Sequence, residues 1–206
     1  MNAQNALKAL VVVVAVSCGT LSAAPLGLTT AFPDFAVTST VNTAYASSTQ
    51  TFTLTGGLSQ YSPSLGVSKV AGNGTGTGLT LTANITNAGG LVSGTLTLNG
   101  IVPQLTGAVA ANLLTANLTA FGFSGSGAST VFEFKGAVTG GTYAASFGSQ
   151  IGVILNPGTT TYAGNFNGNF TGSTGTVDIF TIVPEPCTLA VAGLGGLALL
   201  RRRRRA

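Results

Sequence analysis

Threonine alternates with apolar residues along several short stretches of this chain of 206 residues. In the stretch 51–55, threonines flank Phe52 and Leu54. In the stretch 79–86, Leu79, Leu81, Ala83 and Ile85 fall on one side, and Thr80, Thr82, Asn84 and Thr86 fall on the other. A period of two is that of a β-strand with one buried face, and threonine, valine and isoleucine are favoured in strands. The alternation therefore predicts half-buried strands.

The same pattern recurs along the chain, at 95–99, 132–135 and 165–170. Turn residues separate the runs: Gly56-Gly57, Gly72-Asn73-Gly74, Asn87 to Gly90, Gly125-Ser126-Gly127, Gly140-Gly141 and Asn156-Pro157-Gly158. The Ala-rich segment 107–120 is interpreted as a turn that leads into a strand around 114–123. Short strands with turns about every 8 to 15 residues predict an all-β fold, a single antiparallel β-sandwich or flattened β-barrel.

Two other β architectures could be rich in threonine. Pairs of the form Thr-x-Thr begin at 51, 53, 75, 80, 95, 159 and 174. A β-solenoid needs a fixed period, and an ice-binding surface needs threonines aligned on a flat face, so this irregular spacing favours ordinary solvent-facing strand surfaces. A membrane-spanning barrel needs strands of about 9–11 residues, and the runs are shorter.

The net charge of +4 is unevenly distributed. Five of the eight basic residues form the run 201–205 at the C-terminus. Between Ala24 and Pro186 there are two lysines against four carboxylates, a net charge of −2. Two lysines cannot neutralise the roughly 6–10 phosphates of an ordinary DNA site, so we expect no nucleic-acid partner.

The N-terminal residues 1–23 are typical of a secretory signal peptide with its signal helix. Lys8 precedes the apolar run 9–16, and small residues follow it. Signal peptidase is expected to cleave after Ala23, with Ala24 as the alternative cleavage residue. Cys18 gives a loose likeness to a lipoprotein cleavage box, although Ala15 replaces the leucine usual there.

The C-terminal segment 184–206 has three parts in order. Pro184, Glu185 and Pro186 form a stiff tripeptide. The uncharged stretch 188–200 follows; as a helix it would extend about 20 Å, short of a hydrocarbon core of about 30 Å. The segment ends in five arginines, which stay on the cytoplasmic side of a membrane: Arg201, Arg202, Arg203, Arg204 and Arg205. This order predicts a short C-terminal hydrophobic helix and a transient stop during export.

This arrangement resembles the PEP-CTERM sorting signal of Gram-negative bacteria that make exopolysaccharide. The resemblance implies a sorting motif at Pro184, Glu185 and Pro186, recognised by a membrane-embedded exosortase, and a retention cluster formed by the five arginines. It covers the ends of the chain only. Cys187 departs from the Ala, Ser or Thr expected there, which leaves open a lipid or thiol step. An ordinary membrane anchor is the alternative, against which the short apolar stretch argues.

Residues 24–183 are predicted to form one extracellular domain. It contains no histidine and no cysteine, so we expect no Ser-His-Asp or Cys-His centre, no zinc site, no disulfide and no cofactor. Candidate acid–base residues are Asp34, Glu133 and Asp178. Glu133 shares a strand face with Lys135, which predicts an exposed ion pair. We therefore expect a protein that is not an enzyme.

Two roles remain open for this domain. Its scarcity of charge predicts self-association, glycosylation or immobilisation, as in a structural component of a cell surface, biofilm or extracellular matrix. The alternative is an exopolysaccharide-binding module, in which Tyr45, Tyr61, Tyr143 and Tyr162 stack on sugars. In that alternative, Asn165, Asn167 and Asn169 line one strand face. Asn-x-Ser/Thr sequons occur at Asn73, Asn84, Asn117 and Asn169.

Overall fold

The computed structural model describes residues 24–72, 78–103 and 109–182. The expected signal helix and the short C-terminal hydrophobic helix lie outside these residues. Within them, no helix has the length and apolar character needed to cross a membrane.

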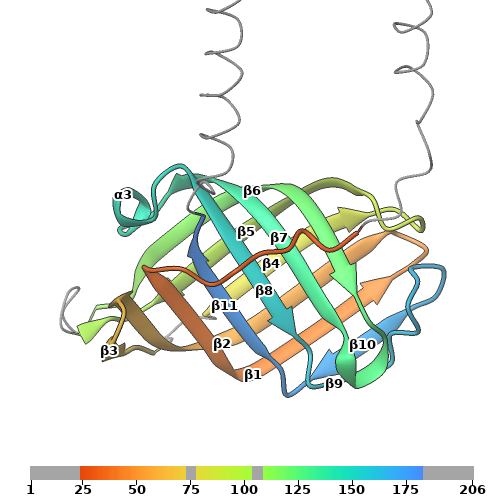
Figure 1. The fold of residues 1–206 in the computed structure, drawn as a ribbon, viewed down its shortest axis with the longest axis horizontal. Coiled ribbons are helices and arrows are strands. Elements are labelled where there is room, and N and C mark those ends of the chain that lie inside the picture. The colour runs from red at the N-terminus through yellow and green to blue at the C-terminus, as the bar shows by residue number, and fades with distance from the viewer. Residues whose placement is uncertain (1–23, 73–77, 104–108, 183–206) are drawn as a thin grey trace, which may run out of the picture.

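Eight antiparallel strands close into a β-barrel (Figure 1). In chain order they are β1 (Asp34–Ala46), β2 (Thr51–Ser64), β4 (Leu79–Ile85), β5 (Leu91–Gly100), β6 (Ala111–Ser124), β7 (Val131–Gly140), β8 (Gln150–Asn156) and β11 (Thr176–Thr181). Around the barrel the order is β2-β4-β5-β6-β7-β8-β11-β1, and pairing of β1 with β2 closes it. The predicted all-β antiparallel class is confirmed, and closure resolves its shape as a barrel.

Three short strands extend the sheet beyond the barrel. β3 (Val67–Val70) pairs with the second half of β2, beyond the residues that pair with β4. β10 (Phe170–Ser173) pairs with the second half of β1, and β9 (Thr159–Thr160) pairs with β10. A 3-10 turn, η2 (Gly127–Ser129), and a one-turn helix, α3 (Ala144–Phe147), lie between strands.

The alternating runs at 51–55, 79–85, 95–99 and 132–135 all lie in strands, as predicted. The strands are longer than the runs, up to 14 residues in β2 and β6. One reason is that Gly56 and Gly57, predicted as a turn, lie inside β2. A Cβ on Gly56 would approach Val37 Cγ1 to 2.5 Å, so this glycine serves close packing between β1 and β2.

The predicted strand at 165–170 is wrong for most of its length, since only Phe170 belongs to a strand. Asn165 Oδ1 accepts a hydrogen bond from the backbone N–H of Asn167, a local bond that competes with strand pairing. Phe166 and Phe170 are buried while the three asparagines are exposed. The segment is therefore a loop whose phenylalanines anchor it to the barrel.

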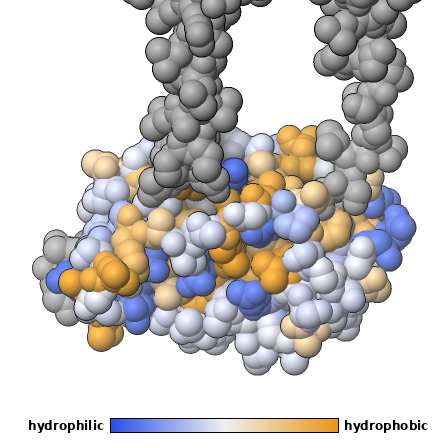
Figure 2. All heavy atoms as spheres, viewed as in Figure 1, coloured by the Kyte–Doolittle hydropathy of each residue, from blue (hydrophilic) through white to orange (hydrophobic). Residues whose placement is uncertain are grey.

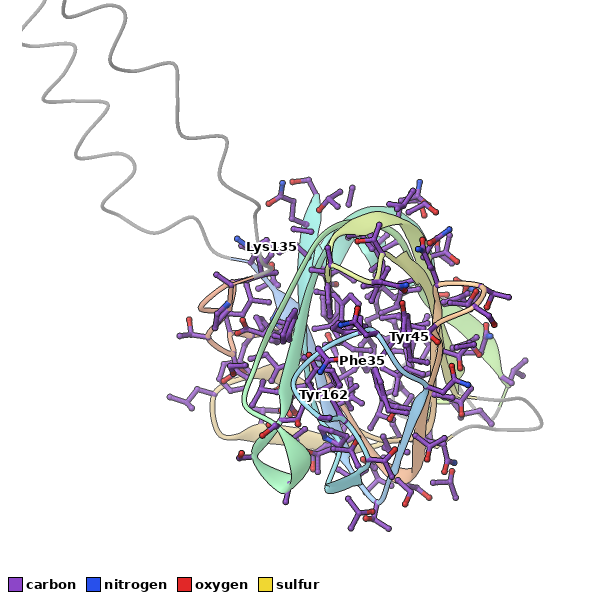
Figure 3. The ribbon with its side chains drawn as sticks, turned by 90° about the vertical axis from the view of Figure 1, so that its right-hand side faces the viewer. Phe35, Tyr45, Lys135 and Tyr162 are labelled. Atoms are coloured by element: carbon purple, nitrogen blue, oxygen red, sulfur yellow. The ribbon has the colours of Figure 1, made fainter. Side chains whose placement is uncertain are left out.

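Apolar side chains fill the barrel interior, and their aromatic rings form two groups. The smaller group comprises Phe35, Tyr61, Tyr143 and Phe147. The larger comprises Tyr45, Phe52, Phe121, Phe123, Phe132, Phe134, Tyr162, Phe166 and Phe170. Figure 3 shows Phe35, Tyr45 and Tyr162 inside the barrel and Lys135 on its outside. The interior is a packed core, which leaves the outer surface to carry function.

Candidate functional site

Charged side chains are unevenly distributed over the strands. The described residues include five charged side chains: Asp34 on β1, Lys69 on β3, Glu133 and Lys135 on β7, and Asp178 on β11. The four consecutive strands β2, β4, β5 and β6 contain none. The scarcity of charge is visible in the sequence, whereas the absence of charge from four neighbouring strands depends on the order of the strands in the barrel.

The outward side chains of these four strands form what we call the threonine wall: Thr53, Thr55, Thr80, Thr82, Thr95, Thr97, Thr115 and Asn117. Strand pairing places them in two rows. One row runs Thr53, Thr82, Thr95, Asn117, and the other runs Thr55, Thr80, Thr97, Thr115. Neighbours in a row lie about 4.8 Å apart, the spacing of paired strands. The irregular Thr-x-Thr spacing along the sequence does not prevent alignment, because antiparallel register brings distant pairs side by side.

A hollow of about 520 Å³ lies in the threonine wall. Its lining includes Thr82, Asn84, Ser93, Thr95 and Asn117. These side chains offer hydroxyl and amide groups and no charge. Such a surface can form hydrogen bonds with a neutral polymer or another uncharged protein surface.

The opposite side of the barrel is crossed by residues 24–33, which we call the strap. Figure 1 shows the strap crossing β7, β8 and β11, in that order, before β1 begins. The carboxylate of Glu133 accepts hydrogen bonds from three successive strap N–H groups: Leu26 and Gly27 donate to Oε2, and Leu28 donates to Oε1 at 2.9 Å. The Glu133 side chain is only 7% exposed. The three hydrogen bonds compensate the free-energy cost of removing its carboxylate from water.

The predicted exposed ion pair of Glu133 with Lys135 is therefore wrong. Glu133 is buried under the strap, and no ion pair of Lys135 occurs in the described part of the chain. The strap lies more than 100 residues from Glu133 in the sequence. No local pattern could have revealed this contact.

The barrel surface under the strap is shaped to receive it. A Cβ on Gly122 of β6 would approach the carbonyl oxygen of Ala24 to 2.4 Å and the backbone nitrogen of Leu26 to 2.9 Å. Phe180 of β11 faces outward over Gly152 of β8, yet it is only 1% exposed. The strap thus packs closely on β6 at Gly122 and on β7 at Glu133.

The two remaining carboxylates lie near each other on this charged side. Asp34 pairs with Phe180 and Asp178 pairs with Ala36, so the two aspartates occupy diagonal positions on β1 and β11. Burial raises the pKa of Asp34, while hydrogen bonds from Ser62 oppose that effect. Burial also raises the pKa of Asp178, and the neighbouring charge of Asp34 adds to it. Each carboxylate therefore resists ionisation more than a free aspartate does.

The three candidate acid–base residues thus separate into two arrangements. Glu133 is engaged by the strap, while Asp34 and Asp178 lie together on the neighbouring strands β1 and β11. Among the described residues, no group of three or more acidic, cysteine or histidine side chains could hold a metal ion.

The four tyrosines predicted to stack on sugars are buried in the core, where a stacking site would need them exposed. Tyr45 and Tyr162 are 2% exposed, Tyr61 is 4% exposed and Tyr143 is 6% exposed. The Tyr45 hydroxyl donates to the carbonyl of Ile85 at 2.8 Å. Burial raises the pKa of all four hydroxyls, and the neighbouring Tyr61 adds to the effect at Tyr143. The four rings pack against other aromatic rings of the core. The polar hydroxyl of a tyrosine therefore does not indicate that its ring is exposed.

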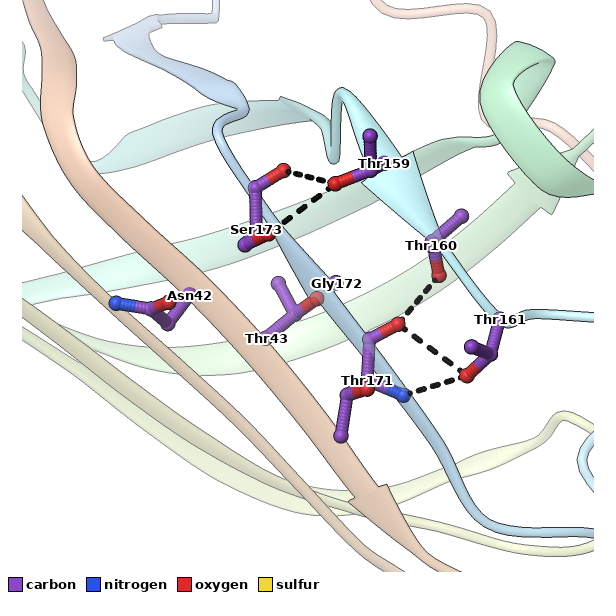
Figure 4. A pocket seen from close by; sticks show the side chains of 8 residues that line it. All are labelled: Asn42, Thr43, Thr159, Thr160, Thr161, Thr171, Gly172 and Ser173. Carbon is purple, nitrogen blue, oxygen red and sulfur yellow. Dashed lines mark hydrogen bonds between the residues drawn. The ribbon is translucent and has the colours of Figure 1, made fainter.

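A second hollow, which we call the hydroxyl groove, lies where β1, β10 and β9 meet (Figure 4). Its volume is about 530 Å³, and it is lined by Asn42, Thr43, Thr159, Thr160, Thr161, Thr171, Gly172 and Ser173. Several hydroxyls are held by the strands: Thr160 and Thr161 donate to the carbonyl of Thr171, and Thr159 donates to that of Ser173. The groove is therefore preorganised, polar and uncharged. In the sequence, the Thr-x-Thr pair that begins at Thr159 is the only signal for this groove.

The sorting motif at 184–186, the arginine cluster at 201–205 and Ala23 of the cleavage site lie outside the described residues. Ala24, the alternative cleavage residue, is the first residue of the strap. Comparison of the chain with protein families, with curated proteins and with solved structures finds no match.

Proposed function

We propose that this chain is an exported protein, sorted by its C-terminal PEP-CTERM signal to the cell surface or extracellular matrix of a Gram-negative-type bacterium. Signal peptidase and an exosortase-type enzyme process it, and the tail contacts the membrane only before processing. The mature barrel acts as a non-enzymatic structural component of a biofilm or similar matrix.

The threonine wall is the observation that carries the structural role. Four neighbouring strands present aligned hydroxyl, methyl and amide groups without a single charge. Ordinary soluble domains keep copies and polymers apart with charged surfaces of mixed sign. A charge-free side permits close contact with neutral matrix polymers, while the charged side is partly covered by the strap.

The test adds charge to the wall and measures retention in the matrix of producing cells. Thr82 and Thr95 are exposed partners on β4 and β5, so a Thr82→Lys/Thr95→Lys variant places two ammonium groups at the centre of the wall. We expect the fraction of protein retained in the extracellular matrix to fall several-fold.

The matched control adds the same two charges elsewhere. Gln150 and Asn156 are exposed at the two ends of β8, and the Gln150→Lys/Asn156→Lys variant should be retained like the parent protein. Equal retention of the wall variant and the parent would overturn the structural role of the wall.

The hydroxyl groove supports a second candidate, a module that binds neutral exopolysaccharide. Sugar hydroxyls form hydrogen bonds with uncharged groups such as those that line the groove. The buried tyrosines do not contribute to this version of the proposal. The Thr171 hydroxyl is suited to a test, because it makes no hydrogen bond within the described residues while its backbone holds Thr160 and Thr161.

A Thr171→Val variant keeps the β-branched shape and removes the hydroxyl. We expect weaker saturable binding to polysaccharide isolated from the producing cells, measured by calorimetry. A Thr55→Val variant on the threonine wall is the control for loss of a hydroxyl. Absence of saturable binding by the parent protein would reject the groove as a glycan site and leave the structural role in place.

A further inference from the structure

The hydroxyl groove and the threonine wall lie on one continuous sheet. β10, which lines the groove, pairs with the second half of β1, and the same half of β1 pairs on its other side with β2 of the wall. β4, β5 and β6 follow β2 in order. Six neighbouring strands therefore connect the groove with the far side of the wall without a break in pairing.

One row of outward side chains runs across all six strands, and we call it the long row. The strand register places each member directly opposite the next, in the order Thr171, Ala44, Thr53, Thr82, Thr95 and Asn117. Directly opposite residues of an antiparallel pair lie on the same face of a sheet. The row thus follows one face, and none of its members is buried.

Each end of the long row enters a hollow. Thr171 lines the hydroxyl groove, and Thr82 and Thr95 line the hollow of the threonine wall. Neighbouring strands are about 4.8 Å apart, so the four spacings from Thr171 to Thr95 amount to about 19 Å along the sheet. Ala44 and Thr53 line neither hollow and connect the two.

Both hollows present donors and acceptors that the fold does not use. The Thr171 hydroxyl makes no hydrogen bond within the described residues. In the same part of the chain, the polar side chains that make no hydrogen bond in the wall hollow are Thr82, Asn84, Ser93, Thr95 and Asn117. A hydroxyl or an amide can both donate and accept hydrogen bonds. A ligand that fills the two hollows can therefore bond to side chains at both ends of the row.

The chemistry of the long row fits a neutral polysaccharide better than a protein. The cores of protein interfaces are enriched in aromatic side chains, and the row contains no aromatic or large apolar side chain. Figure 2 shows a different surface on the side that the strap crosses, where hydrophobic and hydrophilic residues are interspersed. The six strands of the row contain no lysine or arginine that could hold a polyanion. Hydroxyl and amide groups suit the hydroxyls of uncharged sugars.

We propose that a single neutral polysaccharide chain lies along the long row and occupies the hydroxyl groove and the wall hollow together. This inference rests on the proposed glycan binding by the groove and adds the length and the path of the ligand. A chain already held in one hollow is kept close to the other, so the two hollows together bind more tightly than either alone. Retention by the wall and sugar binding by the groove then have one cause.

The length of the ligand provides the direct test. Neutral polysaccharide isolated from the producing cells is partly hydrolysed, and its fragments are separated by length. Calorimetry with the full chain in mild detergent compares fragments clearly shorter than about 19 Å with fragments clearly longer. We expect the long fragments to bind at least about tenfold more tightly than the short ones.

A substitution between the hollows tests the path. Thr53 lies on β2, two strands away from β10, so Thr53→Lys places a long hydrated side chain across the path and leaves the groove intact. We expect this variant to bind long fragments only as weakly as short ones. Its affinity for short fragments should equal that of the parent chain, which also shows that the variant is folded. The control variant Gln150→Lys adds the same charge on β8 and should bind both kinds of fragment like the parent chain.

Equal affinity of the parent chain for short and long fragments would overturn the shared path and leave the groove as a glycan site by itself. A Thr53→Lys variant that keeps the parent's affinity for long fragments would do the same. Absence of binding to every fragment would reject both the glycan proposal for the groove and this inference. Association of the parent chain with itself in the absence of polysaccharide, if Thr53→Lys abolished it, would assign the row to a second copy of the chain and overturn the inference.

Discussion

At the scale of single residues, Glu133 is the clearest case of one side chain ordering a whole segment. Its carboxylate accepts three strap N–H bonds and is almost fully buried. Hydrogen bonds to a charged group contribute about 1.5–3 kcal/mol each. A Glu133→Gln variant keeps the shape and loses the charge and one acceptor, so we expect the free energy of unfolding in urea to fall by about 2 kcal/mol.

Lys135 lies two residues away on the same strand face and makes no contact of this kind in the described residues. A Lys135→Gln variant should change the free energy of unfolding by less than about 0.5 kcal/mol. Equal effects of the two substitutions would show that the strap bonds contribute nothing specific.

Asp34 and Asp178 give stability a dependence on pH. Burial raises the pKa of both carboxyls in the folded protein above the ordinary 3.8. As pH falls from neutral, the folded state therefore takes up these protons before the unfolded state does. The stabilisation grows as pH falls through the folded pKa values and is complete below about 3.8.

A variant with Asp34→Asn and Asp178→Asn is uncharged at these positions at every pH. The difference in unfolding free energy between variant and parent should be largest at neutral pH and shrink as the solution is acidified. Denaturant titrations between neutral pH and mildly acidic pH measure this difference, and a constant difference would contradict the prediction.

At the scale of elements, the strap is held by contacts that a single methyl group can disturb. A Gly122→Ala variant places a Cβ against the backbone of Ala24 and Leu26, and backbone cannot move aside as a flexible side chain can. Overpacking of this kind costs about 1–3 kcal/mol. We expect faster amide hydrogen exchange in residues 24–33, with little change in the interior strands.

Gly168 provides the control, because a Cβ there would meet nothing within 4 Å. A Gly168→Ala variant should leave exchange in the strap unchanged. Unchanged exchange in the Gly122→Ala variant as well would mean that the strap is held elsewhere.

Strands were the elements that the sequence could predict. The alternation at 79–85 and 132–135 reflects which side chains face the core. Neighbouring residues in the sequence are enough to reveal it. Barrel closure depends instead on pairing between β1 and β11, the first and last strands of the barrel, which lie far apart in the chain. The same non-local register aligns the threonines and buries Glu133, so neither the threonine wall nor the strap site could be derived from spacing.

At the scale of the whole molecule, the barrel has two unlike sides around one aromatic core. The side formed by β2, β4, β5 and β6 is free of charge, and the other side carries three carboxylates and the strap. The tyrosines show why composition alone could not divide core from surface. Each belongs to an aromatic group inside the barrel, although its hydroxyl would suit a surface site equally well.

The proposed processing changes the charge of the whole molecule. The precursor carries +4 at neutral pH. Loss of residues 1–23 removes Lys8, and loss of residues 184–206 removes five arginines together with Glu185, which leaves two lysines against three carboxylates, a net charge of −1. Isoelectric focusing of the surface protein should therefore resolve a basic precursor from an acidic mature form, and mass spectrometry should find no arginine run in the latter.

A Pro184→Ala/Pro186→Ala variant keeps every charge of the precursor while altering the sorting motif. We expect this variant to accumulate as a basic species that retains its tail, because a stiff tripeptide is replaced by a flexible one at the expected recognition site. A Gly193→Ala variant, altered within the apolar stretch, should still yield the acidic form. An acidic mature form from the proline variant, or an intact arginine tail on the mature parent protein, would contradict recognition of Pro184, Glu185 and Pro186.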